Sequence, residues 1–158
     1  MTVALVVDSG DFDLVLKKLS PLFNFQPSEL MTTLGALGES QTRRRITDEK
    51  TSPDGTAWTP NHEGTPILVQ TGQHLLYSIA WTASASEAEW GSTWEYAHVH
   101  QDGMTIIPKN GENLAFAIGG KAVFAKSVTI PARPFVGLST DNIKEIIDVV
   151  TDHFGVLQ

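Results

Sequence analysis

Two histidines, His98 and His100, have the spacing at which a β-strand would project both rings to one side. Such a pair can hold a divalent metal, because neutral imidazole is a common ligand of zinc. A metal site needs a third and usually a fourth ligand, and no recognised metal spacing links the histidines to the other candidates, His62, His74, Glu95 and Asp102. A metal-dependent hydrolase built on this pair is therefore a remote alternative. The simpler interpretation has one ring packed and hydrogen-bonded and the other solvated.

A second cluster whose side chains could carry a function consists of Arg43, Arg44 and Arg45. The simpler interpretation is a solvated helix face that is balanced by the acidic residues nearby. The alternative is a basic stripe that faces an acidic partner or DNA inside a channel. Arginines on one side of a ring subunit would produce such a stripe without making the whole chain basic.

Other catalytic patterns are missing from the sequence. There is no cysteine, which excludes thiolate nucleophiles, thiolate metal sites and disulfides. No G-x-S-x-G, GxGxxG or GxxxxGK[ST] pattern occurs, so neither a nucleophile elbow nor a phosphate-binding loop is supported. We expect a protein that is not an enzyme and binds no cofactor.

The composition indicates one soluble domain that spans residues 1–158. Its 41% hydrophobic content can form a core, while a formal charge of -7 makes it a poor general binder of nucleic acid. The N-terminal apolar run has no basic flank before it and is not a signal peptide, and no apolar stretch is long enough to cross a bilayer.

The first half of the chain reads as helices that precede a loop. Residues 3–7 predict a strand and residues 12–19 a short helix. A further helix is expected after an N-cap at Ser28, with Leu30, Leu34 and Leu37 on one face. Gly35 and Gly38 weaken it locally but would let a neighbour pack closely. Residues 39–50 are almost wholly polar, so we expect that part of the helix to leave the core. Residues 51–64 are rich in turn-forming residue types, and Pro53 and Gly55 would fix the backbone conformation there.

The second half predicts antiparallel strands followed by a helix. Thr71 would cap a short helical turn, residues 77–83 and 87–91 would pair as strands, and residues 94–100 are ambiguous between helix and strand. Strands are expected at 105–108, 114–118 and 122–129, with hairpin turns at Asn110-Gly111 and Gly119-Gly120. Pro131 and Pro134 exclude a central strand, and an amphipathic helix should follow a cap at Ser139. The fold class is therefore α+β, with N-terminal helices, a central antiparallel sheet and a C-terminal helix.

Five segments, in order, give the chain a family resemblance: LGALGESQTRRRI, SPDGTAWTP, ILVQTGQHLLYSI, WEYAHVHQDG and IPARPFVGLS. Together with their separations they resemble the phage virion morphogenesis (tail completion) family of Mu-like and other contractile-tailed phages and prophages. The resemblance covers most of the chain, from about Leu34 to Phe154. The sequence departs from the family pattern at Ile46 and Asp102.

The resemblance implies a virion assembly subunit of the head–tail junction, a tail-completion, tail-terminator or neck protein. It would form a homomeric ring, expected to be a hexamer, around the DNA channel. Its partners would be the tail tube, head-completion or connector proteins and, non-specifically, channel DNA, with no membrane involved. It would be located in the cytoplasm of the infected bacterium during assembly and afterwards in the virion. A head-completion protein or a component of a tail-like bacteriocin remains the alternative.

Within that picture, residue types suggest roles. Stiff loops that carry Trp58 and Phe135 suit a subunit interface, and Arg133 could form an ion pair across it. Equally, these side chains could close the core and brace a loop of their own subunit. Arg43, Arg44 and Arg45 are the candidates for the channel or for an acidic partner. The residues expected to shape the loops are Pro53, Gly55, Gly72, His100, Gly103, Pro131 and Pro134.

Overall fold

The computed structural model describes residues 13, 15–20, 25–69 and 74–155. Their elements are α2 (Pro27–Arg44), a π-helical turn (Arg45–Glu49), α3 (His74–Tyr77), β1 (Ile79–Ala83), β2 (Ala88–Ser92), α4 (Ala97–Asp102), β3 (Met104–Ile106), β4 (Leu114–Ile118), β5 (Lys121–Ala125), β6 (Val128–Ile130) and α5 (Thr140–Phe154). The α+β class is confirmed. Residues 15–20 are helical, as expected, whereas the predicted strand at 3–7, Thr71 and Gly72 lie outside the described residues.

Helix α2 begins two residues earlier than the sequence suggested. Its N-cap is Gln26 and Pro27 occupies the first turn, where a missing amide hydrogen costs nothing. Ser28 therefore lies inside the helix and is not the cap. The helix continues beyond Arg44 as the π-helical turn and ends at Lys50, which adopts a left-handed conformation with φ 55°.

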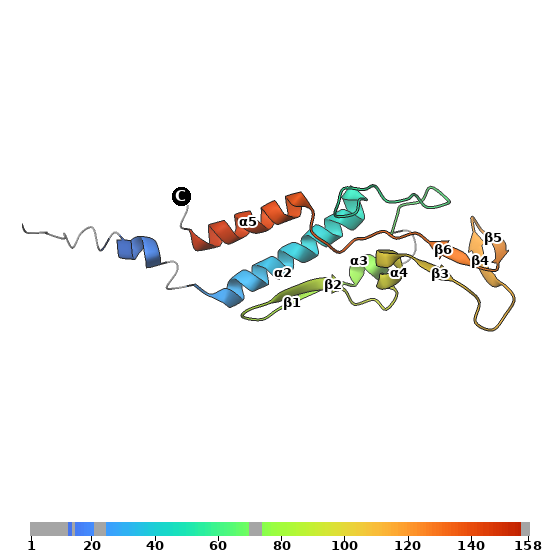
Figure 1. Cartoon of the computed structure of the whole chain (residues 1–158), viewed down its shortest axis with the longest axis horizontal. Coiled ribbons are helices and arrows are strands. Elements are labelled where there is room, and N and C mark those ends of the chain that lie inside the picture. The colour runs from blue at the N-terminus through green and yellow to red at the C-terminus, as the bar shows by residue number, and fades with distance from the viewer. Residues whose placement is uncertain (1–12, 14, 21–24, 70–73, 156–158) are drawn as a thin grey trace, which may run out of the picture.

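Helix α2 lies beside the β1–β2 hairpin (Figure 1), and a pair of tryptophans joins the two elements. The two strands are antiparallel, as predicted, and Trp81 lies opposite Trp90. A Cβ atom at Gly35 would lie 2.6 Å from Trp81, and one at Gly38 would lie no more than 2.7 Å from three atoms of Trp90. The two glycines therefore make the flat helix face on which the indoles lie, as the sequence suggested.

The strands of the described residues form three two-stranded ribbons rather than one continuous sheet. β3 pairs with β6, and β4 pairs with β5. The Gly119-Gly120 hairpin turn is confirmed. Asn110-Gly111 does not join two paired strands, because β3 skips β4 and takes its partner from the far side of the hairpin. Residues 104–130 thus form a projecting arm at one end of the molecule (Figure 1).

The C-terminal helix α5 is set by the predicted cap. The Ser139 hydroxyl accepts from the amide of Asn142, and the Asn142 side chain accepts from the Ser139 amide. The helix lies along α2 and ends at Phe154, whose ring packs against Phe25.

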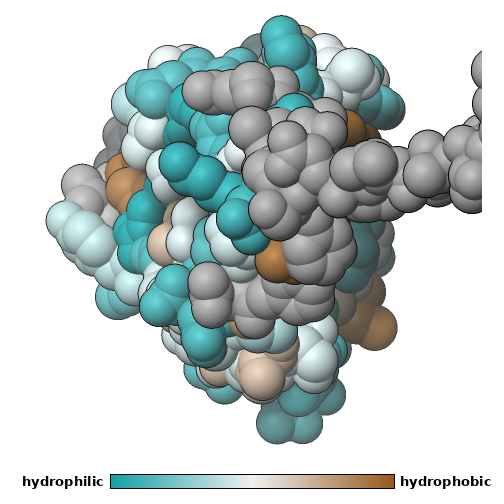
Figure 2. Space-filling view, turned by 90° about the vertical axis from the view of Figure 1, so that its left-hand side faces the viewer, coloured by the Kyte–Doolittle hydropathy of each residue, from teal (hydrophilic) through white to brown (hydrophobic). Residues whose placement is uncertain are grey.

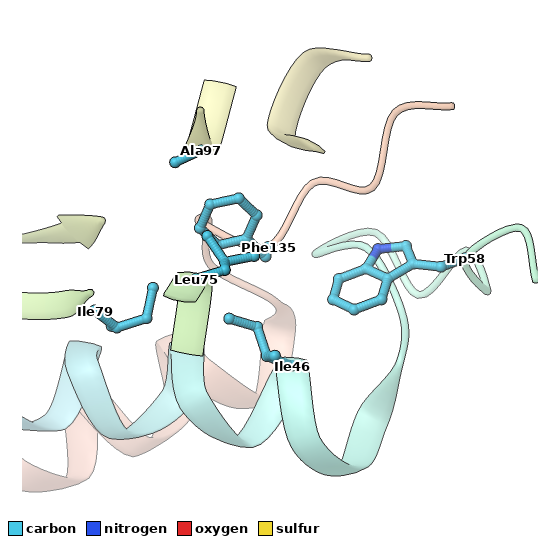
Figure 3. Packing of buried hydrophobic residues seen from close by; sticks show 6 residues of the cluster. All are labelled: Ile46, Trp58, Leu75, Ile79, Ala97 and Phe135. Carbon is cyan, nitrogen blue, oxygen red and sulfur yellow. The ribbon is translucent and has the colours of Figure 1, made fainter. Parts of the chain in front are cut away.

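The core is small and lies where α3, α4 and the π-helical turn meet. Among the described residues, its buried cluster is formed by Ile46, Trp58, Leu75, Ile79, Ala97 and Phe135. In Figure 3, Phe135 occupies the centre of this cluster, and Trp58 approaches from the loop that follows the π-helical turn. Residues 39–50 do not leave the core as expected, because Gln41, Thr42 and Arg45 are buried together with Ile46.

Candidate functional site

The segment of residues 131–139, here called the proline loop, is where distant parts of the chain meet. Pro131 ends β6, as expected of a residue that cannot donate to a ladder. The Gln101 side-chain oxygen accepts from the amides of Phe135 and Val136, and its nitrogen donates to the Val136 carbonyl. The Gln101 side chain of α4 thus satisfies backbone groups of this loop that a neighbouring strand would satisfy in a sheet.

Arg45 holds the proline loop from the opposite side. Its side chain is 0% exposed and donates to the carbonyls of Phe135 and Gly137 and to the Asn142 side chain. Burial lowers the pKa of Arg45, and the Glu49 carboxylate at 3.6 Å acts in the opposite direction. The guanidinium group has no surface to offer to DNA in this subunit. Its role is to join α2 to the proline loop and α5.

The other two arginines also bind groups of their own subunit. Arg43 pairs with Glu39 at 2.8 Å and donates to the carbonyls of Leu76 and Ile79, which ties α2 to α3 and β1. Arg44 pairs with Glu49 at 3.1 Å and with Glu145 of α5 at 2.9 Å. Both side chains keep exposed edges. That Arg43 and Arg44 face a channel remains a prediction.

The residues suggested for the interface lie inside the subunit. Trp58 and Phe135 are 4% and 1% exposed within the core. Arg133 is buried too, and donates to the Thr59 carbonyl and the Asn61 side chain rather than to a carboxylate. The geometry supports the alternative in which they close the core and brace a loop of their own chain.

Most of the loop-shaping residues fulfil that role. Pro53 lies against Gly137, where a Cβ atom would come within 2.5 Å of the proline ring. Gly103, with φ 73°, lies so close to the proline loop that a Cβ atom would be 2.7 Å from the Ala132 nitrogen. Gly55 also has a positive φ, in the turn after Pro53.

The histidine pair does not form a chelate. Residues 97–102 are helical, and two residues of an α-helix are about 200° apart around its axis, so His98 and His100 point in different directions. His98 is exposed, whereas the His100 ring stacks on Trp94 with centroids 5.7 Å apart. Burial and the nearby Arg133 charge lower the pKa of His100. Among the described residues, no three acidic or histidine side chains are grouped to hold a metal.

One feature that the residue types did not single out is the arm of residues 104–130. Its apolar side chains Met104, Ile106, Ile107, Ile118 and Phe124 are exposed. The sequence signal was present, because LAFAI and KAVFA place apolar residues at both odd and even positions, unlike a strand with one solvated face. At the other end of the molecule, Figure 2 shows hydrophobic residues as separate small patches among hydrophilic ones.

The described residues combine a hydrogen-bonded hub around the proline loop with an arm that exposes apolar side chains, and exposed apolar patches mark sites of interaction. Residues 7–155 match the model of the phage virion morphogenesis family, and the chain belongs to that family. It therefore has a structural or assembly role in a phage virion. In the described part of the chain, no helix is both long and apolar enough to cross a membrane.

A curated relative agrees with this membership. The chain is similar to Mu-like prophage FluMu G protein 2 of Haemophilus influenzae, with 34% identity over 95 residues. The match covers 60% of this chain and 56% of the relative, so it spans little more than half of that protein's length. No solved structure matches the chain.

Proposed function

We propose that this chain is a structural subunit of the phage head–tail junction, which completes the tail or joins it to the head as a homomeric ring around the DNA channel. The observation that carries the proposal is the family match along residues 7–155. Its partners would be further copies of itself, the tail tube and the head-completion or connector proteins, and it would be found in the virion.

The architecture supports this role physically. The hub around the proline loop is held by hydrogen bonds from the π-helical turn, α4 and α5, so it loses little entropy when the subunit docks. The arm, by contrast, exposes apolar surface that assembly would remove from water. A stable centre with a projecting contact element suits a subunit that must join two preformed structures.

Deletion of this chain from the phage or prophage that encodes it tests the proposal. We expect DNA-filled heads and finished-length tails that remain unjoined, and recovery of joined virions when purified protein is added to the lysate. Heads that lose their DNA would instead indicate a head-completion protein. Normal virion yield without the chain would contradict the proposal.

A further inference from the structure

The ribbon formed by β4 and β5, residues 114–125, has apolar side chains on both faces. Its register places Ala115 opposite Phe124 and Ala117 opposite Ala122, so these four residues share one face. All four are exposed, Phe124 by 69%, and no residue of either strand is buried. A lone two-stranded hairpin is at best marginally stable in water, so this face is built to be covered.

The face of the β1–β2 hairpin that is turned away from α2 offers a complementary surface. It contains an open hollow of about 610 Å³, lined by Ala80, Thr82, Glu89, Gly91, Thr93 and Val136 together with parts of the tryptophan pair. Gly91 leaves the floor uncovered, since a Cβ atom there would meet nothing within 4 Å. An aromatic ring can therefore enter the hollow and rest on backbone and indole edges.

Charge complementarity favours another copy of this chain as the occupant. The arm has three lysines and one glutamate, a formal charge of +2, within a chain of -7. Around the hollow the signs are reversed, because Glu89 lines it and Glu87 and Asp102 line the hollows beside it. The basic part of this acidic protein thus matches an acidic surface of the same protein.

The spacing of the charges agrees with a single docking register. Lys126 follows Phe124 by two residues, and Glu89 precedes Gly91 by two residues. Lys126 lies in the bend that follows β5. Phe124 above Gly91, with β5 antiparallel to β2, would place Lys126 on the side of the hollow where Glu89 lies.

We propose that Phe124 of one subunit inserts into the hollow over Gly91 of a second copy, with Lys126 beside Glu89. This inference rests on the ring proposed above and names the surfaces that join its subunits. The arm and the β1–β2 turn lie toward opposite ends of the molecule (Figure 1). The proposed contact is heterologous, with the arm of each subunit in the hollow of the next, and repetition of such a contact gives a ring or a filament rather than a two-fold dimer.

Cysteine pairing in the full-length chain tests the contact directly, because the natural sequence has no cysteine. The double variant Phe124→Cys/Gly91→Cys is oxidised with copper phenanthroline and separated on a non-reducing gel. Both positions tolerate the change, since Phe124 is exposed and Gly91 has open space above it. We expect a ladder of trimers and larger species. A mixture of the two single-cysteine proteins should give a heterodimer and nothing larger.

The matched control is Tyr77→Cys/Gly91→Cys, because Tyr77 is equally exposed (72%) but lies on neither surface. Equal ladders in both double variants, or no species above dimer in the first, would overturn the inference. Rings seen by electron microscopy without the Phe124–Gly91 cross-link would overturn it while leaving the proposed function intact. A cross-linked ladder without closed rings would support the contact and count against the ring.

Charge exchange in the Phe124→Cys/Gly91→Cys background gives an independent readout. Lys126→Glu and Glu89→Lys should each slow ladder formation several-fold, and the two together should restore it. If the combined variant stays as slow as the single changes, the proposed register is incorrect.

Discussion

Gly38 of α2 lies directly under the indole of Trp90, so close that the helix has no room for a Cβ atom at this position. Together with Gly35 under Trp81, it sets the distance between the helix and the β1–β2 hairpin. Elsewhere in a helix, alanine is about 1 kcal/mol more favourable than glycine. Here the close approach reverses that preference.

We therefore expect Gly38→Ala to destabilise the protein, because overpacking costs about 1–3 kcal/mol and exceeds the gain in helix propensity. In a chain of this size that corresponds to a fall in Tm of roughly 2–4 °C per kcal/mol, measured by calorimetry. Ser40→Ala, at an exposed position of the same helix, is the control and should not lower Tm. A Gly38→Ala protein as stable as the wild type would show that the indole can move at little cost.

Asn142 takes part in two structures: the hydrogen bonds by which Arg45 holds the proline loop, here called the Arg45 clamp, and the cap of α5. Its side-chain oxygen accepts from the buried Arg45 guanidinium and from the Ser139 amide. Asn142→Ala leaves both donors without this acceptor, so we expect a loss of about 2–4 kcal/mol in the free energy of unfolding, measured by urea denaturation. Lys144→Ala, at an exposed position of α5, controls for helix propensity. Equal stability of the two variants would contradict the clamp.

His100 should make stability dependent on pH. Burial and Arg133 lower its folded-state pKa, whereas in the unfolded chain it binds a proton near about pH 6.5. Its contribution to stability is therefore complete above that pH and is lost as the pH falls toward the folded-state value. We expect Tm to fall between about pH 7.5 and about pH 5, and to fall less steeply in His100→Gln. His98→Gln, on the same helix, is the control. Identical slopes in wild type and His100→Gln would argue against the packed neutral ring.

Variants of Arg44 distinguish between two roles for this residue, an ion pair within its own subunit and a residue that faces a channel. Arg44→Glu places like charges beside Glu49 and Glu145, and we expect a small loss, on the order of 1 kcal/mol, because the pair is partly exposed. Arg44→Glu/Glu145→Arg should recover part of the loss in Tm. If the double variant is stable but virion yield remains low, the positive charge of α2 is needed by a partner. Normal yield would remove Arg44 from the channel prediction.

Local sequence patterns predicted the elements whose partners are close along the chain. The β1–β2 hairpin and the helix after Ser139 follow from residue alternation and from a cap, and both are confirmed. The pairing of β3 with β6 was missed, because Asn110-Gly111 satisfies the rules for a local hairpin turn while the true partner lies beyond an inserted hairpin.

The buried polar side chains of the hub could not be predicted from the periodicity of apolar residues. Counting apolar residues assigns Gln41 and Arg45 to solvent, although both are buried because distant carbonyl groups and Asn142 accept their hydrogen bonds. The hydrogen bonds of Gln101 to the proline loop were not predicted for the same reason. For Trp58, Phe135 and Arg133 the sequence left two roles open, a subunit interface or the core of their own subunit, and only the structure shows that all three are buried within the chain.

The most direct test of the central claim is the mass of the full-length protein in solution, measured by light scattering over a range of concentrations with and without purified tails. Negative-stain images of any large species belong to the same experiment. We predict a closed multi-subunit species with a central hole, formed either freely or on the tail end. A protein that stays monomeric at every concentration and does not bind tails would contradict the account.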